Sequence, residues 1–341
     1  MILKISNLTN PINWFKIFMS PIKSYKLVLK VVSDYPRIQN LFKIKNKKLR
    51  KFIINFYTTL VKKNNNLNYF FLEKNKTVNE IYFNSKDFTD LNPKIFESLA
   101  YNGIIFIENI LTNKEVDQVL KYFTEIEKKD LSTKWENNTI INASNVKYKN
   151  DINVNISYAK KDLSYLPELN QISQTISSKV FGRSIKSYAE FFLHEAINYE
   201  QNNYQDTNFH VDRYLPCLKI IYTPDGIDFD KAPFGFVKKT HKLDNSLVMN
   251  MLLNSNSDML NDKNTSYFAK SDEIKGICKK NTLIVAFTNG IHKRNIFLEK
   301  RVSRKTIFLQ YTDNFNMLSL INYFKFNKKE NKKVNHNSVL Q

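Results

Sequence analysis

The sequence has little cysteine and no long apolar run. Its 341 residues include only Cys217 and Cys278, which are too few for a disulfide framework and favour a reducing setting. No stretch of about 18 apolar residues occurs, which argues against a membrane-spanning helix. Residues 1–20 lack the uninterrupted apolar segment and the small-residue cleavage site of a secretory signal. We therefore expect a cytoplasmic protein, and a hydrophobic fraction of 42% places it among globular chains.

Acidic residues are scarce at the two ends of the chain, which carries a formal net charge of +20. Residues 1–65 contain 14 Lys and Arg but one acid, Asp34, and residues 325–341 contain five Lys and one Glu. The body between them, residues 66–324, holds 33 basic and 30 acidic residues. A nearly neutral body with basic ends is not the pattern of a basic groove, so no specific nucleic-acid partner is expected.

Apolar residues in the basic N-terminal region recur at helical spacing. Leu49, Phe52, Ile53 and Phe56 share one predicted helix face, and lysines fill the other. Two interpretations stay open for this region. Its helices pack against the main domain, or residues 1–65 make weak contact with an anionic membrane surface or an acidic partner.

The middle of the chain carries signals for one short strand and two helices. Gly103–Ile107 is a short apolar run typical of a buried strand. Thr112–Glu115 reads as a capping box that opens a helix. A second helix is expected over residues 168–182, ended by Gly182.

From Ser187 onward the sequence favours strands. Turn-like segments such as Pro224–Gly226 separate them, and no helical crossover lies between them. This pattern indicates an antiparallel double-sheet roll and not a doubly wound sheet. The candidate strands are Tyr188–Tyr199, Cys217–Thr223, Phe234–Val237, Thr282–Phe287 and Lys305–Tyr311.

The tripeptide His210-Val211-Asp212 is the strongest candidate for chemistry. In an extended strand, residues i and i+2 point to the same face, so His210 and Asp212 can hold one cation from one side. His292, in the segment Thr288–His292, is the downstream histidine that fits as third ligand. Two imidazoles and one carboxylate with the opposite positions open make the facial triad of non-haem Fe(II) oxygenases.

Arginine is scarce, and most of it lies close to these candidate ligands. The chain has seven arginines, and Arg213, Arg294, Arg301 and Arg304 are four of them. Arginine presents a rigid fork that binds carboxylates in a way that lysine cannot reproduce. Their position is consistent with an anion-binding site beside the candidate metal.

Four segments together resemble a known family. They are His210–Asp212, Gly235–Lys242, Thr288–His292 and Arg304–Phe308. In order and spacing they resemble the phytanoyl-CoA dioxygenase-like family of Fe(II)- and 2-oxoglutarate-dependent oxygenases. The resemblance covers residues 97–125 and 187–312, roughly half of the chain, and leaves residues 1–90 unmatched. His241, within the second segment, is expected to fix a loop.

The resemblance implies a role for seven residues. The metal ligands, which are also the catalytic residues, would be His210, Asp212 and His292. Arg304 would bind the distal carboxylate of 2-oxoglutarate, with Arg301 as the second choice because the basic run makes the register ambiguous. Contacts to the cosubstrate would also come from Arg294 and Tyr222.

The activity implied is that of an Fe(II)- and 2-oxoglutarate-dependent dioxygenase that uses O2. It would hydroxylate a small molecule or a carrier-bound acyl substrate and release succinate and CO2. A carboxylate at the third ligand position favours hydroxylation over halogenation. Two alternatives stay open: a catalytically inactive jelly-roll binding module, and a cupin-like metal enzyme that does not use 2-oxoglutarate.

The predicted fold is mainly β with flanking α. Its core is a double-stranded β-helix, of the jelly-roll and cupin-like type, with N-terminal helices. Residues 1–90 are expected to form a basic helical extension, residues 91–324 the double-stranded β-helix oxygenase domain, and residues 325–341 a disordered tail rich in Lys and Asn. No feature of the sequence indicates an oligomeric state.

Overall fold

The structure is a computed structural model, and it describes the parts of the chain that build the sheets and the helices around them. The described residues are 45–51, 54–55, 58, 69–71, 76–89, 92–127, 134–136, 139–148, 151–159, 166–185, 189–198, 208–213, 216–243, 253, 273–295, 298 and 302–312. The predicted C-terminal tail, residues 325–341, lies outside them, as do residues 1–44 of the predicted extension. Among the described helices, none combines the length and the apolar character needed to cross a membrane.

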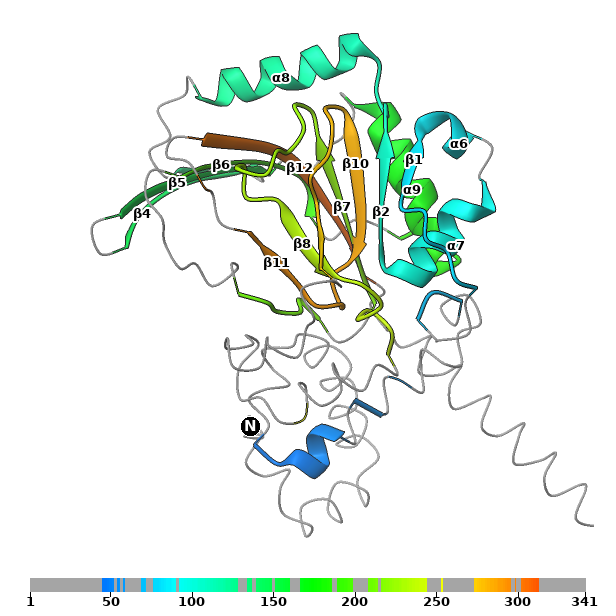
Figure 1. The fold of residues 1–341 in the computed structure, drawn as a ribbon. Coiled ribbons are helices and arrows are strands. Elements are labelled where there is room, and N and C mark those ends of the chain that lie inside the picture. The colour runs from blue at the N-terminus through cyan, green and yellow to red at the C-terminus, as the bar shows by residue number, and fades with distance from the viewer. Residues whose placement is uncertain are drawn as a thin grey trace, which may run out of the picture.

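Two sheets form the body of the molecule (Figure 1). The major sheet has nine strands in the order β1-β2-β10-β7-β12-β6-β5-β4-β3, and the minor sheet has three in the order β11-β8-β9. All described pairings are antiparallel except that of β1 with β2. The strands are β1 Tyr82–Asn84, β2 Ile104–Glu108, β3 Lys134–Glu136, β4 Thr139–Tyr148, β5 Asp151–Ala159, β6 Ala189–Asn198, β7 Cys217–Thr223, β8 Phe234–Val237, β9 Glu273–Lys275, β10 Thr282–Phe287, β11 His292–Arg294 and β12 Val302–Thr312.

An apolar layer joins the two sheets face to face. Alternate residues of a strand point to opposite faces, and on β2 it is Ile104 and Phe106 that point to this layer. The minor sheet contributes Phe234 and Phe236 from β8, and Ile274 from β9. Two sheets packed around one apolar layer confirm the predicted double-stranded β-helix core with flanking helices.

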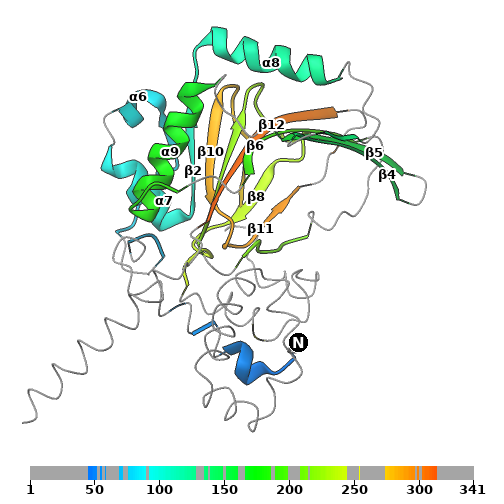
Figure 2. The ribbon, with the colours of Figure 1, turned by 180° about the vertical axis from the view of Figure 1, so that it is seen from behind.

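The other face of the major sheet is covered by helices, as Figure 2 shows from behind. Ile105 and Ile107 of β2 and Tyr222 of β7 belong to this second apolar cluster. Helices α7 (Pro93–Asn102) and α9 (Pro167–Phe181) pack on it through residues such as Leu99 and Val180. Helix α6 (Ser85–Thr89) follows β1 directly. The major sheet is therefore buried on both faces along its central strands.

Local signals in the sequence account for where the helices begin and end. Helix α8 (Asn113–Glu127) begins after the predicted capping box, in which the Thr112 backbone N–H donates to Glu115 Oε2 at 2.7 Å. Gly182, with φ 67°, ends α9 as predicted, and Gly103, with φ 84°, ends α7. The strand predicted over Gly103–Ile107 therefore begins one position later, because Gly103 serves as the left-handed cap of α7.

Residues before position 91 also contribute to this body. Strand β1 lies at one edge of the major sheet, and Ile54, Phe70 and Phe71 are buried in the apolar cluster beneath the helices. The predicted start of the oxygenase domain at residue 91 thus falls after residues that already belong to the sheet. Two interpretations were open for the N-terminal region. These described residues concern the first, packing against the main domain, and not contact with a membrane surface or an acidic partner.

Candidate metal centre

Backbone hydrogen bonds place His210 beside His292. The N–H of His210 donates to the carbonyl of His292 at 2.8 Å, and the N–H of His292 donates to the carbonyl of His210 at 2.9 Å. A reciprocal pair of this kind is the unit of an antiparallel ladder. The Asp212 N–H adds a bond to the carbonyl of Thr288 at 2.9 Å. The segment His210–Asp212 is thereby fixed beside the segment Thr288–His292, where β11 begins.

Each histidine ring is oriented by a carbonyl two residues before it. His210 Nδ1 lies 2.8 Å from the carbonyl oxygen of Asn208, and His292 Nδ1 lies 2.9 Å from that of Gly290. A carbonyl oxygen only accepts hydrogen bonds, so both Nδ1 atoms carry the proton. The Nε2 lone pairs are then directed away from the backbone and available as metal ligands.

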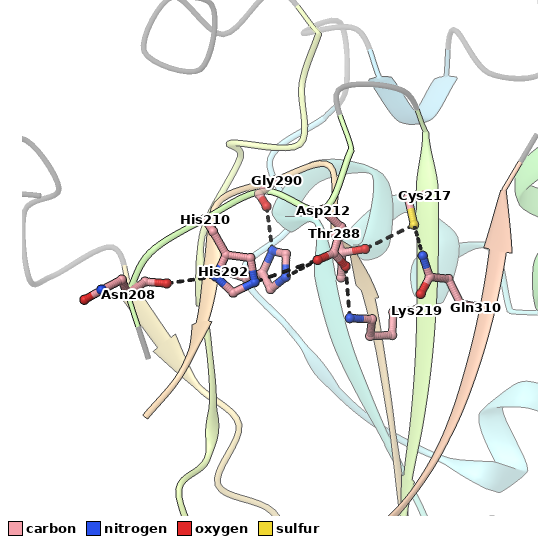
Figure 3. A network of polar contacts seen from close by, with 9 residues as sticks. All are labelled: Asn208, His210, Asp212, Cys217, Lys219, Thr288, Gly290, His292 and Gln310. Atoms are coloured by element: carbon pink, nitrogen blue, oxygen red, sulfur yellow. Dashed lines mark hydrogen bonds and ion pairs between the residues drawn. The ribbon is translucent and has the colours of Figure 1, made fainter. Parts of the chain in front are cut away.

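The three ligand atoms converge on a single point (Figure 3). Asp212 Oδ1 lies 3.8 Å from His210 Nε2 and 3.5 Å from His292 Nε2, and all three atoms lie within 4.8 Å of one another. His292 Nε2 is buried and makes no hydrogen bond. A buried, unpaired acceptor is costly, and a divalent cation would satisfy it. Two imidazole nitrogens and one carboxylate oxygen are a donor set that suits a divalent transition metal.

The electrostatics of the site keep His210 and Asp212 in the forms that bind metal. Burial, and then the proximity of His292, lowers the pKa of His210 to about 4. Burial alone would raise the pKa of Asp212, but the Lys219 ammonium and the two histidines outweigh it and hold that pKa well below its usual range. At neutral pH the site therefore presents neutral imidazole at His210 and an ionised carboxylate.

A lysine that was not predicted belongs to this centre. Lys219 Nζ lies 2.9 Å from Asp212 Oδ2. Lys219 comes from β7, where alternation turns residues 217, 219, 221 and 223 to one face of the strand. Alternation within the predicted strand Cys217–Thr223 places Lys219 and Tyr222 on opposite faces, but it does not tell which of the two faces the metal ligands.

Cys217 supports the turn that precedes His292. Its buried sulfur accepts hydrogen bonds from Thr288 Oγ1 at 3.2 Å and from Gln310 Nε2 at 3.1 Å (Figure 3). Its backbone carbonyl accepts the N–H of Thr288 at 2.8 Å. Burial, and then the charge of Asp212, raises the pKa of the Cys217 thiol. This cysteine is thus a neutral structural partner of the turn, not a ligand.

A cavity of about 130 Å³ opens between the two sheets beside these residues. The major sheet contributes one face of β7, β10 and β12, and the minor sheet contributes β8 and β11. Apolar side chains and basic side chains share its wall. The lining residues are His210, Lys219, Ile221, Ile227, Phe234, Ile284, His292, Lys293, Arg294, Arg304, Thr306 and Phe308.

Two of the four predicted cosubstrate residues line this cavity. Arg304, on β12, is buried, and its guanidinium donates to the carbonyl of Ala232. Arg294, the last residue of β11, is half-buried. Arg301 lies outside the described residues. The structure therefore brings Arg304 and Arg294 to the same cavity as the candidate metal ligands.

The prediction for Tyr222 is corrected by the structure. Its neighbours Lys219 and Ile221 face the cavity, whereas Tyr222 points to the opposite side of β7 and is buried in the cluster beneath the helices. Its hydroxyl donates to Asn281 Oδ1 at 3.1 Å. Strand alternation thus separates Tyr222 from the cavity by the full thickness of the sheet.

His241, the other histidine singled out from the sequence, lies away from the metal ligands and packs in the interior. Its ring stacks on Phe287 with centroids 5.2 Å apart, and its Nε2 lies 3.1 Å from the carbonyl of Ala100. Burial, followed by the charge of Lys242, lowers its pKa to about 3. It joins the loop after β8 to the end of α7.

Comparisons with known proteins give likenesses in structure alone. No protein-family model matches the chain, and no curated protein matches it in sequence. Solved structures similar to it include AviO1 from Streptomyces viridochromogenes Tue57, at 12% identity over 64% of this chain and 92% of that one, with a TM-score of 0.45. The epimerase SnoN, in complex with Fe3+, alpha ketoglutarate and nogalamycin RO, has 12% identity over 66% and 84%, with a TM-score of 0.46. EctD from S. alaskensis, with bound Fe, has 12% identity over 70% and 80%, with a TM-score of 0.46.

Proposed function

We propose that this chain is an Fe(II)- and 2-oxoglutarate-dependent dioxygenase. The observation that carries the proposal is the convergence of His210 Nε2, His292 Nε2 and Asp212 Oδ1 at a cavity that also holds the buried Arg304. Three protein ligands on one side leave the other coordination positions of an octahedral ion open. Iron bound there would supply, with 2-oxoglutarate and O2, the oxidising power to hydroxylate a substrate, with succinate and CO2 as co-products.

The chain's own residues would bind and orient the cosubstrate. Arg304 would take its distal carboxylate, because guanidinium forms two parallel hydrogen bonds with a carboxylate. Its pairing with the carbonyl of Ala232 fixes one edge of the guanidinium. Arg294, at the end of β11, would add positive charge to the same cavity. Arg301 stays the second choice for this role.

Apolar residues of the cavity would exclude water from the reacting region. Ile221, Ile284 and Phe234 line it from β7, β10 and β8. Exclusion of water strengthens electrostatic interactions within a site and suppresses side reactions. The substrate we propose is a small molecule or a carrier-bound acyl group, as in the phytanoyl-CoA dioxygenase-like family that the sequence resembles.

Anaerobic titration tests the proposal. Protein loaded with Fe(II) should develop a visible charge-transfer band as 2-oxoglutarate is added, and admission of air should yield succinate. Absence of both the band and succinate would leave the binding-module alternative. Iron binding without any effect of 2-oxoglutarate would favour the cupin-like metal enzyme.

A further inference from the structure

The two oxygens of Asp212 have different surroundings. Oδ1 faces the two histidine Nε2 atoms at 3.5 and 3.8 Å, whereas Oδ2 lies 2.9 Å from the Lys219 ammonium. The Asp212 and Lys219 side chains are only 24% and 21% exposed. An ion pair in such a partly buried place is screened less by solvent than one at the surface. The carboxylate group is thereby held in one orientation, with Oδ1 toward the two histidine Nε2 atoms and Oδ2 toward Lys219.

The position of Lys219 is fixed by the centre of the major sheet. Lys219 lies opposite Ala286 of β10 and opposite Gln310 of β12, so strands pair with β7 on both sides of it. Residues in a central strand cannot shift without disturbing both ladders. The backbone at Lys219 is thus anchored, and the side chain reaches Asp212 from the major sheet.

We propose that Lys219 is a positioning residue that restricts Asp212 to offering one oxygen to the metal. This inference rests on the function proposed above. A carboxylate that turned freely could present both oxygens and occupy two coordination positions. With only Oδ1 bound, three of the six positions of an octahedral ion would stay open, whereas a second carboxylate oxygen would take one of them and compete with a chelating 2-oxo acid.

Because Lys219 is charged, its positioning role predicts opposite effects on metal affinity and on 2-oxo acid affinity. Residues that orient metal ligands usually strengthen metal binding when they are present. A cation beside a divalent ion opposes its binding through Coulomb repulsion. Removal of the Lys219 charge should therefore leave affinity for the bare metal equal or higher, while affinity for the 2-oxo acid falls. A merely structural role would lower both.

Co(II) is a suitable probe, because its visible absorption reports coordination without turnover. Wild-type protein and the Lys219→Met variant would be titrated first with Co(II) and then with 2-oxoglutarate. We expect the variant to bind Co(II) as tightly as wild type or more tightly. We expect its affinity for 2-oxoglutarate to fall by about tenfold or more, a loss of ~1.4 kcal/mol per tenfold.

Lys293→Met is the matched control. Lys293 lines the same cavity, but its ammonium pairs with Glu273 at 3.2 Å and does not contact Asp212 in the described structure. Its loss should weaken 2-oxoglutarate binding much less and leave the Co(II) spectrum as in wild type. An equal loss in both variants would mean that general positive charge matters, and the positioning role would be rejected.

Other outcomes of these titrations would overturn the inference or the proposed function. Weaker Co(II) binding in folded Lys219→Met, or unchanged 2-oxoglutarate binding, overturns the inference. If far-UV circular dichroism shows that this variant does not fold, Lys219→Gln takes its place with the same criteria. If wild type itself binds no 2-oxoglutarate, the proposed function fails. The inference is then judged by the bare Co(II) spectrum, which Lys219→Met must change and Lys293→Met must not.

Discussion

At the scale of single residues, the candidate site depends on how each imidazole ring is held. His292 Nε2 is buried without a hydrogen bond, while the Nδ1 of the same ring is held by the carbonyl of Gly290. His210 repeats the arrangement with Asn208. Two rings with the same tautomer, fixed by carbonyls at the same spacing, indicate that the Nε2 atoms are prepared for a common ligand.

Substitution of His292 should abolish most metal binding. His292→Ala removes one of the three proposed ligands and leaves the others in place, so affinity for Co(II) or Fe(II) should fall at least about a hundredfold. Isothermal titration or metal competition would measure it. Asp228→Ala is the control, because Asp228 is exposed and pairs with Lys231 at 3.3 Å. Full metal affinity in His292→Ala would rule out the ligand set.

Arg304 should affect the cosubstrate and not the metal. Arg304→Met removes a guanidinium that we assign to the distal carboxylate, and a hydrogen bond to a charged group contributes about 1.5–3 kcal/mol. Affinity for 2-oxoglutarate should therefore fall roughly ten- to hundredfold, with Fe(II) affinity unchanged. Arg183→Met, a charge-matched change at an exposed position, should have no effect. A normal 2-oxoglutarate affinity in Arg304→Met would assign the carboxylate to another residue.

At the scale of elements, the end of α7 is tied to the loop that follows β8. Gly103 has φ 84°, and a Cβ built on it would meet His241 Nδ1 and lie 2.8 Å from Phe236 Cζ. Gly103→Ala should therefore lower the free energy of unfolding by roughly 2–4 kcal/mol, from left-handed strain and overpacking together. Gly182, with φ 67° at the exposed end of α9, is the control. Gly182→Ala should cost only about 1 kcal/mol.

Chemical denaturation of the two variants would test this difference. Equal losses would show that the contact with His241 and Phe236 adds nothing to the strain at Gly103. A larger loss in Gly103→Ala would establish that His241 and Phe236 leave no room for a side chain at the α7 cap.

Element boundaries that were predicted well share one physical cause. Strands β7, β8 and β10 have the bounds that the sequence predicted, because each is a short, largely apolar and buried run bounded by turn residues. Strands β1 and β9 have three residues each, too few to show a period. They are defined by their partners in the sheet, which no local pattern contains.

The candidate site follows the same division between local and long-range information. His210 and Asp212 were predictable because their spacing carries the chemistry, and His292 because it stands in a recognisable segment. Lys219 and Tyr222 were not predicted correctly, because the sequence does not tell which face of β7 lines the cavity. That face is set by the register of β7 against β10 and β12, and sequence alternation alone leaves the two choices equal.

At the scale of the whole molecule, two buried histidines make stability depend on pH. The pKa of His210 is lowered to about 4 and that of His241 to about 3, both by burial first, whereas an unfolded chain has values near 6.5. Between the folded and the unfolded pKa values, the unfolded state binds more protons than the folded state. The free energy of unfolding therefore falls as the pH drops from about 6.5 toward 4. At about pH 5 each histidine should account for a loss of about 2 kcal/mol relative to neutral pH.

Urea unfolding of metal-free protein near neutral pH and near pH 5 would measure this loss. His210→Gln should remove its share of the pH dependence and leave that of His241. Asp212 contributes nothing in this window, because its pKa is held well below its usual value and its stabilising charge is lost only at lower pH. A flat stability over this range would contradict the buried, neutral state of both rings.

The reciprocal backbone pair between His210 and His292 joins two segments far apart in the sequence. An ion held by both imidazoles would act there as a cross-link, closing a long loop in a chain whose two cysteines remain free. Closing a long loop removes conformational freedom from the unfolded ensemble, and a ligand bound only by the folded state stabilises it by mass action. The supply of the metal would then set how long the chain survives proteolysis as well as how fast it works.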